Sequence, residues 1–60
     1  MKLLSEHKND DETKTAKVFY DDNGEYVVVV KTDTGSYYNA VFKDMNSAEY
    51  FAEEWVVKDD

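Results

Sequence analysis

Apolar and polar positions divide the chain into segments with different periodicities. Residues 16–20, 25–31 and 36–43 are rich in β-branched and aromatic side chains and are separated by Asn-Gly and Thr-Gly pairs. This pattern predicts three consecutive β-strands. After residue 45 the spacing changes, with Ala48, Phe51, Ala52 and Trp55 at positions i, i+3, i+4 and i+7. That spacing is typical of a helix with one apolar face.

The N-terminal part of the chain has a different character. Residues 5–15 contain no apolar side chain, and Leu3 and Leu4 are the only expected anchors ahead of them. A segment with nothing to bury is expected to be mobile. The sequence therefore predicts a flexible acidic arm over residues 1–15 and one domain over residues 16–58. The expected fold class is α+β, a three-stranded antiparallel meander with one C-terminal helix packed on one face (βββα).

The turns set the expected register of the sheet. A type I′ turn at Asn23-Gly24 pairs Tyr20 with Val27, and a similar turn at Gly35 pairs Val27 with Phe42. One face of the sheet then carries a nearly apolar set, which the helix is expected to cover: Val18, Tyr20, Val27, Val29, Tyr38, Ala40 and Phe42. A three-residue bulged loop would reverse this assignment.

The opposite face is the candidate site for binding. A helix covers one side of a sheet only, so Phe19, Val28 and Val41 would form an exposed apolar row with a polar rim, as in many protein interfaces. The full candidate interface is Phe19, Val28, Val30, Val41, Tyr26 and Tyr37. Two alternatives to an interface stay open, because valine is favoured in strands generally and the Leu3-Leu4 segment could fold back over the row.

The start of the helix also has a sequence signature. Asn46 is the expected N-cap, with Glu49 reaching back three residues later in a capping box. Met45 lies before this cap, where it could pack on Tyr50 as a hydrophobic staple.

Composition narrows the class of protein. Sixty residues allow one small domain, and the absence of cysteine excludes a disulfide framework and favours a reducing compartment. The formal net charge is -7, and the longest apolar run is far shorter than the roughly 20 residues that span a bilayer. We therefore expect a cytoplasmic protein, without an export signal, that binds neither membranes nor nucleic acid.

Candidate chemistry is sparse. His7, the single histidine, lies in the polar arm, where we expect it to be solvated rather than catalytic. Asp21, Asn23 and Gly24 imitate part of a calcium loop, but Phe19 and Val30 would occupy its first and last ligand positions. The sequence therefore predicts a protein that is not an enzyme, with no catalytic, cofactor-binding or metal-binding residues and no small-molecule substrate.

Acidic residues suggest an alternative function. Carboxylates at phosphate-like spacing would imitate a nucleic acid and occupy a DNA-binding protein of a host. The candidate residues for this mimicry are Asp21, Asp22, Glu25, Glu49, Glu53 and Glu54, with Asp59 and Asp60 beside them. They fall on a turn and on the helix, whose relative placement the sequence does not fix.

Two resemblances accompany these patterns. Residues 26–56, ending in the helix with Ala48, Ala52 and Trp55, resemble in outline the arm-type DNA-binding domains of phage integrases and the plant AP2 domain. Those families read DNA with Arg, Lys and Trp on the open sheet face. This chain has Lys17 and Lys43 among valines there, at a net charge of -7, so the resemblance implies the βββα outline and not DNA binding.

The second resemblance is to small uncharacterised proteins of marine T4-like phages, especially cyanophages. It covers residues 15–57 and is carried by residues 15–20 (TAKVFY), residues 24–28 (GEYVV), the turn at residues 33–35, an aromatic third strand and the helix. It implies a viral origin, a host cytoplasmic location and a βββα outline. The expected function is a small acidic module that binds a protein partner or associates with itself.

Overall fold

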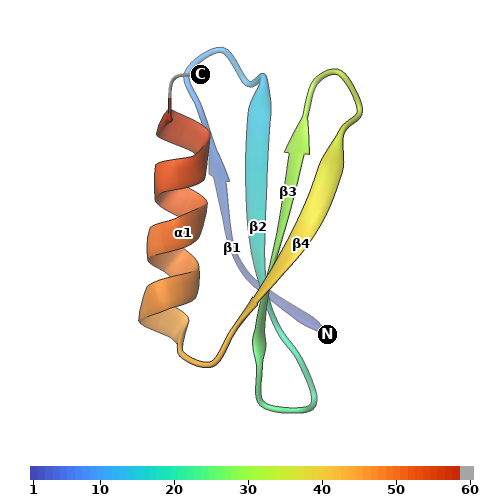
Figure 1. Ribbon diagram of the computed structural model, residues 1–60, viewed down its shortest axis with the longest axis vertical. Helices are drawn as coiled ribbons and strands as arrows, with labels where there is room; N and C mark the ends of the chain where they lie inside the picture. The colour runs from blue at the N-terminus through green and yellow to red at the C-terminus, as the bar shows by residue number, and fades with distance from the viewer. Residues whose placement is uncertain (59–60) are drawn as a thin grey trace.

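The computed structural model describes residues 1–58 and contains one antiparallel sheet and one helix (Figure 1). The elements are β1 (Lys2–Lys8), β2 (Lys14–Tyr20), β3 (Tyr26–Thr32), β4 (Tyr37–Phe42) and α1 (Met45–Val57). The strands lie in the order β1-β2-β3-β4, so each pairs with its neighbour in sequence. The α+β class and the C-terminal helix are confirmed, and the sheet has four strands rather than the expected three.

The additional strand comes from the segment that was expected to be a flexible arm. β1 pairs with β2 from Lys2 opposite Tyr20 to Lys8 opposite Thr15, with an irregularity at Leu4. In the connecting turn, the Asn9 side chain donates to Thr13 Oγ1 at 2.9 Å and accepts from the Lys14 amide at 3.0 Å. The prediction of an arm over residues 1–15 is wrong because backbone hydrogen bonds to β2 hold this mostly polar segment as an edge strand.

Both later turns are three-residue bulged loops rather than two-residue turns. The Asp21 amide donates to the Glu25 carbonyl at 2.8 Å, and Gly24 has a φ of 83°. The Thr32 amide likewise donates to the Ser36 carbonyl at 2.9 Å, and Gly35 has a φ of 96°. A loop of this kind places one residue in the left-handed region, where glycine has no steric penalty.

These loops shift the register of β3 by one residue. Tyr20 pairs with Tyr26 instead of Val27, and Val28 pairs with Val18 and Ala40. Because side chains alternate between faces, the shift moves every β3 side chain to the opposite side. The residues Val28 and Val30 are therefore fully buried under the helix, and their expected exposure on the open face is wrong.

The core lies between α1 and one face of the sheet. Its buried members are Ala16, Val18, Val28, Val30, Ala48, Ala52 and Val56. The helix packs mainly against β2 and β3, and the small side chains of Ala48 and Ala52 let it approach the sheet closely. No helix in residues 1–58 is long and apolar enough to cross a membrane.

The helix α1 begins at Met45, directly after an aspartate. Asp44 is the N-cap, and its Oδ2 accepts from the Ser47 amide at 2.9 Å. This bond holds the pKa of Asp44 below its ordinary value. The predicted cap at Asn46 is wrong, because Asn46 already lies inside the first turn, and Glu49 makes contacts with β1 instead of closing a capping box.

Candidate functional site

An apolar row crosses all four strands on the face of the sheet that α1 leaves uncovered. The register places Leu3 beside Phe19, Phe19 beside Val27 and Val27 beside Val41. We call these four residues the apolar row. Leu3 is 49% exposed and Val41 57%, whereas Phe19 is half-buried and Val27 is only 9% exposed between its neighbours. The two outer members of the row are thus exposed, and an apolar row on an uncovered face is a candidate contact surface.

Lysines lie next to the apolar row on the same face. One row further along the strands come Glu6, Lys17, Val29 and Asn39, and the next contains Lys8, Thr15, Lys31 and Tyr37. A shallow hollow of about 290 Å³ is lined by Glu6, Lys8, Thr15, Lys17, Val29 and Lys31. The paired positions of this face thus carry three lysines and one glutamate, although the whole chain has a net charge of -7.

Half of the candidate interface lies on the face where it was predicted. Phe19, Tyr37 and Val41 lie on the open face. Tyr26 packs against the core cluster, and Val28 and Val30 belong to that cluster.

Leu3 and Val27 are members of the apolar row that sequence reasoning missed. The glycines after Asn23 and Thr34 are compatible with bulged loops as well as with two-residue turns, so they did not fix the register. Leu3 could be placed only once β1 was known to be a strand.

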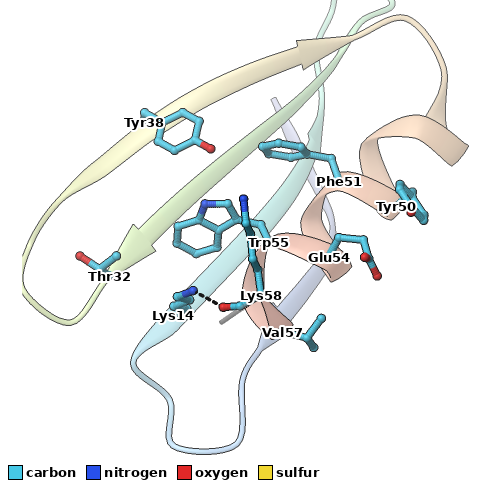
Figure 2. A pocket seen from close by; sticks show the side chains of 9 residues that line it. All are labelled: Lys14, Thr32, Tyr38, Tyr50, Phe51, Glu54, Trp55, Val57 and Lys58. Atoms are coloured by element: carbon cyan, nitrogen blue, oxygen red, sulfur yellow. Dashed lines mark hydrogen bonds between the residues drawn. The ribbon is translucent and has the colours of Figure 1, made fainter. Parts of the chain in front are cut away.

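A second hollow lies between the helix and the ends of β2, β3 and β4 (Figure 2). Its volume is about 680 Å³, and Trp55 and Tyr38 face each other across it edge to face, with ring centroids 6.5 Å apart. Lys14 Nζ lies 5.5 Å from the Trp55 ring centroid and donates to the Lys58 carbonyl at 2.6 Å. Aromatic rings form much of the lining of this hollow, and Thr32, Glu54 and Lys58 contribute polar groups at its margin.

A serine, a histidine and a glutamate meet where β1 contacts α1. Glu49 Oε2 accepts from Ser5 Oγ at 2.7 Å, and Glu49 Oε1 lies 2.9 Å from His7 Nε2. The pKa of Glu49 is lowered, first by the Ser5 hydrogen bond and then by His7, and partial burial opposes this effect. His7 is therefore held against the helix, and the expectation of a solvated histidine is wrong.

The arrangement of these three residues differs from that of a hydrolase. In a catalytic triad, a carboxylate holds one ring nitrogen of histidine while the other nitrogen accepts the proton of serine. Here both Glu49 and Ser5 are near the same nitrogen, Nε2, and Ser5 donates to Glu49. The cluster is a polar connection between edge strand and helix, which we call the β1–α1 clip.

The acidic candidates for nucleic-acid mimicry are divided between separate elements. Asp21, Asp22 and Glu25 belong to the loop between β2 and β3, whereas Glu53 and Glu54 are exposed on α1. Glu49 is engaged in the β1–α1 clip and does not take part in a free acidic surface. Asp59 and Asp60 lie outside the described residues. Within residues 1–58, no group of three or more His, Asp or Glu side chains is arranged to hold a metal ion.

Comparison with protein-family models, with curated proteins and with solved structures finds no match to this chain.

Proposed function

We propose that this protein is a non-enzymatic module that binds a partner protein through the open face of its sheet. The observation that carries the proposal is the apolar row of Leu3, Phe19, Val27 and Val41, which spans all four strands on the uncovered face. Protein interfaces combine an apolar centre with a polar rim, and this face has both.

The charges of the face indicate what kind of partner fits. Lys8, Lys17 and Lys31 lie beside the apolar row, with Glu6 as the one acidic side chain among them. A partner with apolar side chains flanked by carboxylates would be complementary to this arrangement. Charge complementarity chiefly accelerates association and selects the partner, while the apolar contact supplies most of the affinity.

Lysine substitutions at the two ends of the apolar row test this proposal. Leu3→Lys and Val41→Lys each place a charge in the contact while leaving the core untouched, and each should weaken binding at least tenfold. Val57→Lys is the matched control, because Val57 is 64% exposed on the helix, away from the row. Each variant and the parent chain would serve as bait in a lysate, with captured proteins quantified by mass spectrometry and affinities then measured with the purified partner.

The pattern across variants decides the outcome. A partner lost with Leu3→Lys and Val41→Lys but retained with Val57→Lys supports the proposal. Its binding should also weaken as salt rises, because the lysine contacts are exposed and therefore screened. The proposal is wrong if every captured protein binds the two row variants as well as it binds the parent.

A further inference from the structure

The two edges of the sheet are protected to different extents. β1 is interrupted by the irregularity at Leu4 and carries Lys2, Glu6 and Lys8, which are features that discourage pairing with another strand. β4 forms the other edge, and its pairing with β3 is regular from Tyr37 to Phe42 without a bulge or proline (Figure 1). An edge strand of this kind is a template for an additional strand.

The backbone groups available at the β4 edge follow from the hairpin bond. Because the Thr32 amide donates to the Ser36 carbonyl, hydrogen-bonded pairs with β3 alternate along β4 and fall on Tyr38, Ala40 and Phe42. The amide and carbonyl groups of Tyr37, Asn39 and Val41 therefore point away from β3. They form three donors and three acceptors in a row along the open edge.

Charge distribution indicates which strand fits this edge. Residues 34–42 form the longest run without a charged side chain in a chain that is 35% charged. A two-fold axis brings a residue at the axis next to its own copy, and every other residue of the strand next to a residue of the same segment, so self-pairing is favoured for a segment without charges. The β4 segment meets this condition, whereas the charged β1 edge does not.

We propose that β4 pairs antiparallel with β4 of a second copy of this chain, around a two-fold axis at Asn39, to give a continuous eight-stranded sheet. This register makes hydrogen-bonded pairs of Asn39 with itself and of Tyr37 with Val41 of the second copy. All three outward-pointing residues then pair, and no other two-fold register pairs all of them with one another.

The side chains of β4 also match in this register. On the helix side, Tyr38 lies opposite Ala40 of the second copy, so a large exposed ring meets a small side chain. On the open face, Tyr37 lies opposite Val41 of the second copy, an aromatic and β-branched pair of the kind that stabilises sheets. The two Asn39 side chains meet at the axis, where their amides are complementary. Dimerisation at this edge leaves Leu3 and Phe19 free for a partner protein.

Sedimentation of three chains over a wide concentration range tests the association. The parent chain should form a dimer, and Asn39→Asp should weaken that dimer at least tenfold, because two carboxylates then face each other at the axis. Asn46→Asp adds the same charge at an exposed position in the first turn of α1 and should leave the dimer unchanged. Added salt should strengthen the dimer, since both copies carry a net charge of -7.

Single cysteines test the register. The chain has no cysteine, so a disulfide in Asn39→Cys can form only between copies. Paired residues at the axis have Cα atoms about 5.5 Å apart, within the range that a disulfide bridges. Tyr37→Cys is the matched control on the same side of β4, since its two copies would lie about 13 Å apart along the strands.

Copper-phenanthroline oxidation should therefore link Asn39→Cys quickly and Tyr37→Cys slowly. A parent chain that stays monomeric at all concentrations overturns the proposal, and so does a dimer that Asn39→Asp leaves intact. Equal rates of linkage at positions 37 and 39 overturn the register. Because Leu3→Lys leaves β4 unchanged, failure of the dimer is distinguishable from failure of the partner-binding proposal.

Discussion

The two faces of the sheet are built from the same kinds of residue but lie in different environments. Val28 and Val30 point toward α1 and are fully buried, whereas Val41 points the other way and is 57% exposed. Neighbouring valines along β3 are nearly identical in sequence context, yet alternate between core and open face. Composition alone therefore does not distinguish the core from the uncovered face in a sheet with one helix; the register does.

The largest difference between the faces should appear when the same charge is placed on each. Val28→Lys puts an unpaired ammonium group into the core, and burying a charge costs more than the few kcal/mol expected for a domain of this size. We expect this variant to be unfolded. Val41→Lys should change the free energy of unfolding by about 1 kcal/mol or less, because the side chain remains in water.

Circular dichroism and urea titration of the two variants measure this difference. A cooperative, parent-like transition in Val28→Lys would contradict the register of β3. Val41→Lys and the parent chain should be compared at a concentration too low for the proposed dimer to form, so that loss of association is not counted as loss of folding stability.

A substitution at the edge of the face that α1 covers should have an intermediate effect on the free energy of unfolding. Trp55 is half-buried and contacts the Tyr38 ring and the Lys14 ammonium group. Trp55→Ala should cost about 2–3 kcal/mol, less than truncation of a fully buried tryptophan. Tyr37→Ala is the control on the open face, where a 73% exposed ring should contribute less than about 1 kcal/mol. Equal losses in the two variants, measured by urea unfolding, would show that the helix does not stabilise its face of the sheet.

The smallest effect concerns the β1–α1 clip on the covered face. The pKa of Glu49 is lower in the folded chain than its ordinary value of about 4.5. The Glu49 carboxylate therefore stabilises the fold fully above that pH, and this stabilisation is lost as the pH falls through the lowered pKa. Glu49→Gln should reduce stability at neutral pH by about 1 kcal/mol or less, since the clip is partly exposed to solvent. The difference in stability between Glu49→Gln and the parent chain should become smaller as the pH falls below about 4.5.

Thermal unfolding from neutral to acidic pH tests this dependence. Glu53→Gln is the control, because Glu53 is exposed one turn later on the same helix. If Glu49→Gln and Glu53→Gln lose the same stability at every pH, the clip makes no contribution of its own.

Local sequence patterns account for the elements after residue 15. Apolar periodicity predicted three strands and a helix, and the glycines at positions 24 and 35 predicted the two connecting hairpins. These features are local, because strand preference, helical spacing and turn chemistry depend on residues that are near each other in the chain. The side on which Phe19, Tyr38 and Val41 lie was also predicted correctly.

Features that depend on distant residues emerged only in the folded chain. A mostly polar segment became β1 because β2 offered a row of backbone partners, and this placed Leu3 in the apolar row. His7 and Glu49 are 42 residues apart in the chain and meet only when β1 packs beside α1. The faces of Val27 and Val28 depended on one residue of loop length, since the side-chain period of a strand is two. A pattern of apolar residues predicts that one face of a strand will be buried. Which face lies against the helix depends on the register of the sheet, and the lengths of the loops between the strands set that register.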